Sequence, residues 1–173
     1  SASGSGGTAV SLFGGANTVL NGGTITAGDV ALSGGGGEET ISNTGAITGS
    51  VNLAGGNDSI TNNGTISGNV DLGDGDDSFE YLAGSSVTAV DGGAAIDTAT
   101  FTISATDGAE TVDASTFTNF ETADHSAGGA LTFSGDVSFD TLIVGTNSAL
   151  TLANANASNV TTTLDAGSSL TVD

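Results

Sequence analysis

Acidic residues recur at one place in a repeating pattern along this 173-residue chain. Each is followed directly by Ser or Thr, and an amide opens the series, which runs Asn17, Glu39, Asp58, Asp77, Asp97, Glu121 and Asp140. Two carboxylates held about 4.8 Å apart repel each other by about 0.9 kcal/mol in water, and by more at a lower effective dielectric. If the fold stacks these residues, the stack therefore favours a bound cation.

The densest acidic segment, residues 73–79, is the best candidate for a metal site. Ca²⁺ takes about six to eight oxygen ligands in flexible geometry, and glycine-rich turns expose carbonyl oxygens beside the carboxylates. We therefore predict a Ca²⁺ site whose ligands come from three successive coils: Asp74, Asp76 and Asp77, with Asp58 from the preceding coil and Asp97 from the following one. The competing interpretation is a solvated acidic edge that confers solubility and holds no ordered ion.

Catalytic chemistry finds little support in these residues. His125 is the only histidine, and in the sequence Asp-His-Ser it cannot form a triad along one strand, so we expect a histidine in a surface loop. The chain has no Lys or Arg to act as a Schiff base or as a basic proton abstractor. Two carboxylates suffice for a glycosidase, but no aromatic platform accompanies the acids here. We predict no catalytic residues, no cofactor-binding residues and no enzymatic activity.

The composition limits the partners and the class of protein. With no Lys or Arg and 20 acidic residues, the chain has a net charge of −20 and lacks the cations that bind phosphate, so we expect no nucleic acid partner. Cysteine is absent, which excludes disulfides. The chain has no apolar run of about 18 residues, so we expect no direct membrane insertion. Despite 29 glycines, 36% hydrophobic residues indicate a buried core.

A period of about 20 residues organises the apolar residues. Pairs of apolar or small residues separated by one position begin at Val10, Val30, Val51, Val70, Val90, Val112, Leu131, Leu150 and Leu170. Two more columns run in phase with them: Val19, Ile41, Ile60 and Phe79, and Ile25, Ile47, Ile66 and Val87. Gly and Asn corners separate these short segments, and no helical stripe appears.

This pattern predicts an all-β fold, a parallel β-solenoid (β-helix) of about nine coils of about 20 residues, with three short strands per coil. Equivalent side chains stack in such a fold, so Val30, Val51 and Val70 should be neighbours. A β-sandwich is the alternative, but it does not require three columns to stay in phase. We expect a single β-solenoid domain over residues 1–173, with a flexible Gly/Ser lead-in at 1–9 and an irregular coil or insertion at 98–119.

Residues 55–68, 119–122 and 131–136 resemble the repeats of Gram-negative autotransporter passengers and related large bacterial surface adhesins. This resemblance implies a secreted, surface-displayed β-solenoid, often a stalk or an adhesive fibre. Residues 73–79, and more weakly 55–60 and 91–98, are similar to the calcium-binding Gly-Gly-x-Gly-x-Asp nonapeptide of RTX toxins. The acidic half-motif occurs here once per 20 residues, whereas RTX coils pair two nonapeptides.

These observations predict an extracellular structural protein at the cell surface of a Gram-negative bacterium, which forms a surface fibre or matrix filament. Neither end shows an evident polar cap, so we expect end-to-end self-assembly, with other copies of the chain as head-to-tail partners. We expect adhesion to a host surface, an abiotic surface or a glycan. The alternative is a calcium-binding, RTX-like folding and secretion module of a larger exoprotein.

Overall fold

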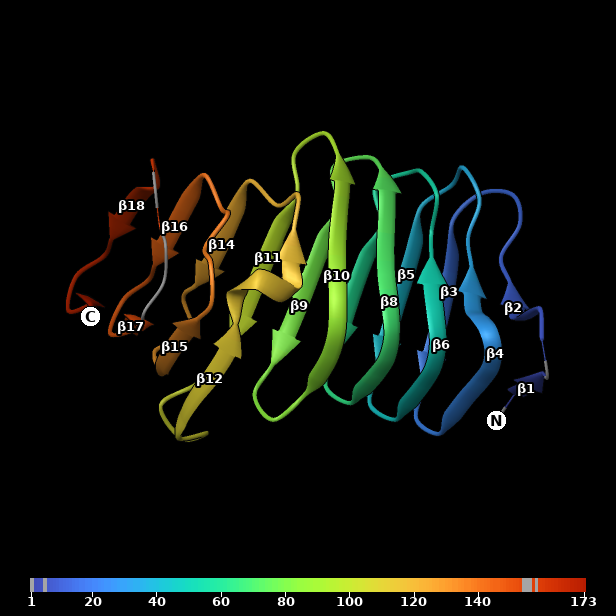
Figure 1. Ribbon diagram of the computed structural model, residues 1–173, viewed down its shortest axis with the longest axis horizontal. Helices are drawn as coiled ribbons and strands as arrows, with labels where there is room; N and C mark the ends of the chain where they lie inside the picture. The colour runs from blue at the N-terminus through green and yellow to red at the C-terminus, as the bar shows by residue number, and fades with distance from the viewer. Residues whose placement is uncertain (1, 5, 154–156, 158) are drawn as a thin grey trace.

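The computed structural model describes residues 2–4, 6–153, 157 and 159–173. The chain winds around one long axis as a parallel β-solenoid of about eight turns, which confirms the predicted fold class (Figure 1). Its only described helix is a short 3₁₀ turn, η1 (Ala114–Thr116). None of the described residues form a helix with the length and apolarity needed to cross a membrane.

Three parallel sheets run along the axis. The long sheet has eight strands: β3 (Asn17–Asn21), β5 (Glu39–Asn43), β7 (Ser59–Asn62), β9 (Ser78–Leu82), β11 (Thr98–Thr102), β14 (Thr122–His125), β16 (Thr141–Val144) and β18 (Thr161–Leu164). The N-terminal sheet contains β1 (Ala2–Gly4), β2 (Thr8–Ser11), β4 (Thr24–Ser33), β6 (Ala46–Asn52), β8 (Thr65–Asp74), β10 (Ser86–Ala94) and β13 (Phe117–Thr118). The C-terminal sheet contains β12 (Ala109–Asp113), β15 (Ala130–Ser134), β17 (Ala149–Ala153) and β19 (Ser169–Val172).

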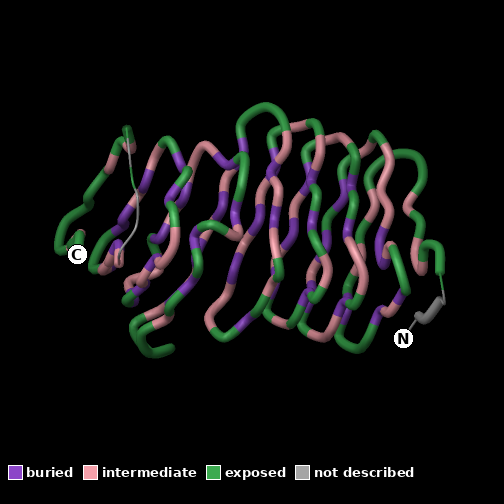
Figure 2. The backbone as a smooth tube through the Cα atoms, viewed as in Figure 1, coloured by how far each residue is buried: buried purple, intermediate pink, exposed green. Residues whose placement is uncertain are grey.

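A typical coil has two strands, one in the long sheet and one in a facing sheet, where we expected three short ones. The difference arises because β4, β6, β8 and β10 are long and bent, and each contains two of the expected segments. Buried and exposed residues alternate along the strands, as Figure 2 shows, so that every second side chain enters the space between the sheets.

Two of the predicted apolar columns are confirmed by the strand register. The first contains Val19, Ile41, Ile60 and Phe79, which are successive partners in the long sheet. The second contains Ile25, Ile47, Ile66 and Val87 in the N-terminal sheet. Both columns face the core, where Ile47 and Phe79 have no exposed surface. The core of the N-terminal half is therefore a set of aliphatic ladders along the axis.

The prediction that Val30 stacks on Val51 and Val70, in the apolar column that begins at Val10, is wrong. Val51 and Val70 are register partners as predicted, but Val30 lies opposite Ser50, and Leu32 takes the place opposite Val51. The register shifts within β4, which has ten residues where β6 has seven, and the additional residues form a bulge. The mean period of 20 residues does not show that individual coils differ in length, which is why the sequence misplaced Val30.

The same column is also broken in the C-terminal half. Val90 has Phe117 as its register partner, and Val112 pairs with Phe133 rather than with Leu131. The cause is that the facing sheet changes along the axis. The N-terminal sheet ends at β13, and the C-terminal sheet begins at β12. The predicted single column is thus two columns in two sheets.

Residues 98–119, which we expected to be irregular, form the junction between these sheets. The spacing from Thr98 to its partner Thr122 is 24 residues, and the segment between them contains β11, β12, η1 and β13. In the expected lead-in at 1–9, β1 and β2 both pair with β4, while residues 1 and 5 lie outside the described residues.

An aromatic cluster fills the core at the junction. Phe101 is fully buried, and its ring centre lies 4.9 Å from that of Phe133 and 5.1 Å from that of Phe117, both in edge-to-face geometry. Tyr81 and Phe139 pack against the same ring at 6.1 and 6.4 Å. These bulky rings occupy the core where the facing sheet changes and the aliphatic ladders are interrupted.

Candidate functional site

The predicted acidic series forms a continuous ladder along one corner of the solenoid, where each coil enters the long sheet. The backbone N–H of Glu39 donates to Asp58 Oδ1 at 2.6 Å, and that of Asp58 donates to Asp77 Oδ1 at 2.6 Å. The N–H of Asp77 donates to Asp97 Oδ1 at 2.8 Å, and that of Asp97 to Glu121 Oε2 at 2.7 Å. We call these five residues the acid ladder. Each carboxylate therefore links its own coil to the coil before it.

Four rungs of the acid ladder are buried, with Glu39, Asp58, Asp77 and Asp97 only 0–3% exposed. In each of these four, one carboxyl oxygen accepts a hydrogen bond and the other is buried without a hydrogen-bond partner: Glu39 Oε2, Asp58 Oδ2, Asp77 Oδ2 and Asp97 Oδ2. An isolated buried carboxylate is strongly disfavoured unless it is paired or neutralised by a proton. The free oxygens are thus the chemically unusual feature of this corner.

The packing around the free oxygens is tight. A Cβ atom added to Gly34 would lie 2.7 Å from Glu39 Oε2, and one added to Gly92 would lie 3.0 Å from Asp97 Oδ2. Leu53 and Leu72, which precede Asp58 and Asp77 by the same five positions, have no exposed surface. At Gly34 and Gly92 there is therefore no room for even a methyl group beside the free oxygens.

Burial and mutual repulsion change the acidity of the middle rungs. Desolvation by burial, with the charges of Glu39 and Asp77 adding to it, raises the pKa of Asp58 to about 7, against the lowering effect of its hydrogen bond from the Glu39 N–H. Desolvation likewise raises the pKa of Asp97 to about 6 and also raises that of Asp77. The middle of the ladder therefore retains protons at a pH where exposed aspartates have lost them.

A second polar ladder, made of amides, lies at the opposite end of the same strands. Asn21 Nδ2 donates to Asn43 Oδ1 at 2.8 Å, and Asn43 Nδ2 donates to Asn62 Oδ1 at 2.8 Å. Asn62 Nδ2 then donates to the carbonyl of Ser86 at 3.1 Å. Asn43 and Asn62 have no exposed surface. Unlike the acid ladder, this amide ladder has donors and acceptors in balance, so it stabilises the corner without a free polar group.

Glycines beside the amide ladder allow the corners to stack closely. The chain turns at Asn-Thr-Gly45 and Asn-Asn-Gly64, as the sequence indicated. A Cβ on Gly64 would overlap the carbonyl oxygen of Gly45, and one on Gly45 would overlap the carbonyl of Gly23. Only glycine therefore fits at this corner.

The structure divides the five predicted calcium ligands into two groups. Asp58, Asp77 and Asp97 are buried rungs of the acid ladder, whereas Asp74 and Asp76 are exposed. Asp76 Oδ1 accepts the backbone N–H of Ile96 at 3.1 Å. Among the described residues, no group of three or more Asp, Glu, His or Cys side chains has an arrangement that could hold a metal ion. Ca²⁺ binding stays a prediction, and its proposed ligands do not converge on one point.

The expectation that His125 lies in a surface loop is wrong. It is the last residue of β14, and only 2% of it is exposed. Its Nδ1 lies 3.0 Å from the carbonyl oxygen of Phe101, and its Nε2 lies 3.0 Å from that of Gly129. Both contacts are to backbone acceptors, so the ring connects β11 to the turn after β14. The imidazole serves the packing of the junction and faces no candidate nucleophile in these contacts.

The row of hydroxyls beside the acid ladder was not recognised from the sequence as a surface. The Ser or Thr that follows each member of the series lies on the outer side of the long sheet, and Thr161, which follows Val160, continues the row. These residues are register partners across all eight strands: Thr18, Thr40, Ser59, Ser78, Thr98, Thr122, Thr141 and Thr161. The Oγ atoms of Ser59 and Ser78 are 3.0 Å apart and hydrogen-bonded. The repeated acid–hydroxyl pair thus places one member inside and the other outside.

The fold and its two polar ladders define the class as a β-solenoid repeat protein. Comparison with protein-family models, with curated proteins and with solved structures finds no match to the chain.

Proposed function

We propose that the chain is a structural segment of an extracellular bacterial surface fibre or matrix filament, in which solenoids stack end to end. The observation that carries this proposal is the unpaired strand edge at each end of the long sheet. One edge is β3 and the other is β18, and the described strands leave the outer side of each without a partner. Such edges pair with a further strand, whether it belongs to a continuation of the same chain or to a second copy.

Apolar side chains accompany the open edges. Leu20 in β3 is 79% exposed, and Phe13 next to the first coil is 83% exposed. At the other end, Val172 in β19 is 66% exposed and Leu164 in β18 is 51% exposed. The large exposed hydrophobic residues of the described chain lie mostly at these ends. Leu164 and Val172 are register partners of buried residues of the preceding coil, so they face inward and an added coil would cover them. Leu20 lies on the outer face of β3, next to the open edge.

The composition supports an exposed, long-lived location. The chain has no Lys or Arg for trypsin-like cleavage, and no Cys or Met for oxidation. A net charge of −20 keeps the sides of the solenoid from associating with each other, so contact between copies is favoured at the ends. Surface display on a Gram-negative bacterium and an adhesive output are part of the same proposal, which is consistent with the resemblance to autotransporter passengers.

The test is assembly of the purified chain. We expect a mass that rises with protein concentration in analytical ultracentrifugation, and fibres of uniform width in electron micrographs. Leu164→Lys places a charge in the inward-facing column at the open edge β18 and is expected to lower assembly at least tenfold. Ile96→Lys is the matched control, because Ile96 is 65% exposed and lies in the turn between β10 and β11, far from both edges.

Two outcomes decide the proposal. A chain that stays monomeric at all concentrations, or equal loss of assembly in both variants, would contradict it. The same samples are measured with Ca²⁺ and with EDTA by circular dichroism. Collapse of the β signal on chelation would favour the calcium-dependent module instead of the fibre.

A further inference from the structure

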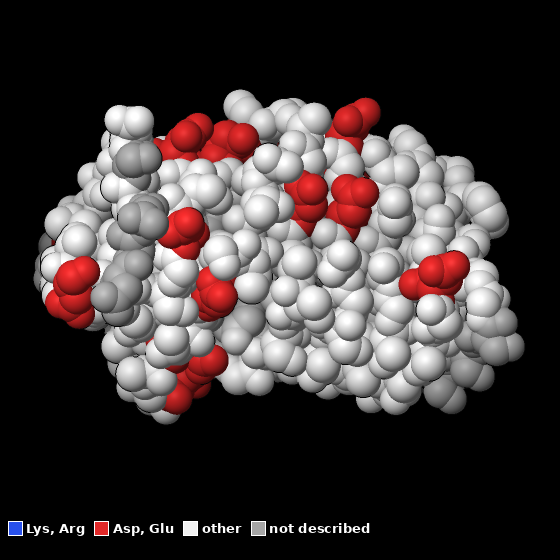
Figure 3. Space-filling model, viewed as in Figure 1, with Lys and Arg blue, Asp and Glu red and all other residues white. Residues whose placement is uncertain are grey.

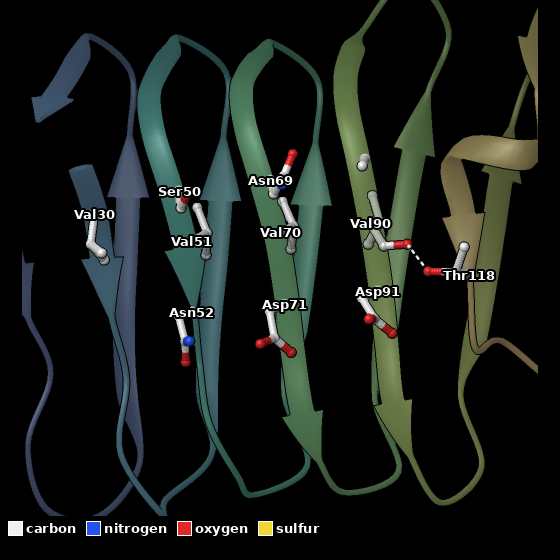
Figure 4. Close-up of a pocket in the computed structure, with 11 residues that line it drawn as sticks. Val30, Ser50, Val51, Asn52, Asn69, Val70, Asp71, Val90, Asp91 and Thr118 are labelled. Carbon is white, nitrogen blue, oxygen red and sulfur yellow. Dashed lines mark hydrogen bonds between the residues drawn. The ribbon is translucent and has the colours of Figure 1, made fainter. Parts of the chain in front are cut away.

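A groove of about 500 Å³ lies on the outer side of the N-terminal sheet, across β4, β6, β8, β10 and β13 (Figure 4). Its volume falls in the range of small-ligand sites, about 300 to 1,000 Å³. The floor is formed by Val51, Val70 and Val90, whose side chains are turned into the core and are 1% exposed. The groove is thus a feature of the backbone path and would be present before any ligand binds.

The bend of the long strands explains the hollow. The register shifts within β4 and between Val87 and Ala89 in β10, where the strand changes direction. Gly49 adopts a φ of +108° at the corresponding place in β6. Each coil bends at the same height, so the bends line up as one trough parallel to the solenoid axis.

A polar row follows one wall of this groove. Asn52, Asp71, Asp91 and Thr118 are successive register partners on four adjacent coils, and Figure 4 shows Asn52, Asp71 and Asp91 side by side. Asn69, on the neighbouring position of β8, also lines the groove. The row combines amide, hydroxyl and carboxylate groups, which together donate and accept hydrogen bonds.

The two carboxylates at the centre of the row lack a cation. Asp91 Oδ1 accepts bonds from Asn119 Nδ2 at 2.7 Å and from the Gly93 N–H at 3.1 Å, both from neutral groups. Burial, with the charge of Asp91 adding to it, raises the pKa of Asp71. The chain has no Lys or Arg, and its one histidine is buried at the junction. Figure 3 shows a pair of acidic groups near the middle of a face without basic residues, so no basic side chain of the chain neutralises them and the site is open to a cationic ligand.

An ammonium group fits between these carboxylates. Neighbouring strands are about 4.8 Å apart, and an N–H donor of an ammonium forms hydrogen bonds of about 2.8 Å to a carboxylate oxygen, so one nitrogen reaches both coils. We propose that the groove binds an amino sugar of a surface glycan, with its ammonium group between Asp71 and Asp91 and its hydroxyls on Asn52, Asn69 and Thr118. This inference rests on the adhesive part of the proposed function. The row has only two carboxylates, and its other polar groups are neutral, so it matches one ammonium group surrounded by hydroxyls better than the several ammonium groups of a lysine-rich peptide.

The experiment compares two trisaccharides that differ in charge at the amino groups. Binding of fully deacetylated chitotriose and of triacetylchitotriose to the purified chain is measured by titration calorimetry at pH 7. We expect the deacetylated form to bind at least tenfold more tightly. We expect Asp71→Asn to reduce its affinity at least tenfold, whereas Asp140→Asn stays within twofold. Asp140 is exposed and lies away from the groove, so both variants remove the same charge from the surface.

Several outcomes would overturn the inference. These are equal affinity of Asp71→Asn and the unmodified chain, an equal loss in Asp140→Asn, equal affinity for the acetylated sugar, and tighter binding of trilysine than of chitotriose. Circular dichroism checks that each variant is folded. Electron micrographs of the same samples separate the two proposals, because a groove that fails to bind leaves fibre formation intact.

Discussion

Raising the pH is expected to destabilise this solenoid through the middle of the acid ladder. Asp58 has a pKa of about 7 in the fold and an ordinary value of 3.8 when unfolded. Between these two values the folded chain holds a proton that the unfolded chain has lost, so the free energy of unfolding falls as the pH rises. The stabilising contribution is complete below about pH 4 and is lost as the pH passes through about 7.

The size of the change in unfolding free energy follows from the number of pH units between the start of the titration and the pKa of Asp58. One pKa unit corresponds to about 1.4 kcal/mol, so Asp58 alone lowers the free energy of unfolding by about 3 kcal/mol between pH 5 and its own pKa. Asp97, with a pKa of about 6, acts in the same direction over about one unit of that range. Neighbouring rungs are coupled, so the two contributions are not simply additive.

The assay is chemical unfolding followed by circular dichroism at several pH values from 5 to 8. Asp58→Asn keeps an oxygen for the Glu39 N–H and removes the buried charge. An uncharged amide already stands at the first position of the series, where Asn17 Nδ2 donates to Glu39 Oε1 at 2.9 Å. We expect the variant to be more stable than the unmodified chain at pH 8 by about 2 kcal/mol, with a flatter dependence on pH.

General repulsion among the exposed acids has the same sign, and two controls separate it. Asp140→Asn removes an exposed charge and should leave the pH slope nearly unchanged. Salt at about 1 M shortens the screening length to about 3 Å and weakens surface repulsion, but not the cost of a buried carboxylate. Stability that is constant or rising from pH 5 to 7, or an equal slope in Asp58→Asn, would refute the role given to the ladder.

Three further substitutions test the packing. Asn43→Ala interrupts the amide ladder and leaves buried partners free, so a loss of about 2 to 3 kcal/mol in unfolding free energy is expected by denaturant titration. Gly64→Ala would force a Cβ against the Gly45 carbonyl and should lower the melting temperature clearly, whereas Gly15→Ala, which meets no atom within 4 Å, should not; equal effects would contradict the close stacking. Phe101→Ala should cost about 3 to 5 kcal/mol, and a loss below 1 kcal/mol would show that the junction cluster is not a unit.

The parts of the fold that the sequence predicted are those with regular spacing. Ile41, Ile60 and Phe79 lie one coil apart with alternating neighbours, and alternation within a fixed period determines both their strand and their inward face. Val30 was misplaced because a bulge adds residues without changing residue types. The exchange of facing sheets near residues 98–119 coincides with an aromatic cluster from neighbouring coils, and a mean period does not encode such tertiary packing.

The candidate site was predicted in position but not in environment. The spacing of Asp58, Asp77 and Asp97 placed them in one column, and the register confirms this. A carboxylate next to a turn signal reads as exposed, so their burial was not foreseen. They lie two positions before inward-facing residues of the long sheet, such as Ile60 and Phe79, so the alternation of the strand turns them into the core. The sequence shows this spacing, but not that the alternation extends through the turn to the acidic residues.

The direction of the ladder hydrogen bonds determines how such a rod responds to being pulled. The hydrogen bonds between coils point along the long axis, so coils pulled along it carry the tension in series and separate one after another. A released coil of about 20 residues, which occupied about 4.8 Å of length, extends to about 66 Å or more of chain. If the proposed fibre holds a cell, its tether would therefore lengthen in steps as the outermost turns unwind.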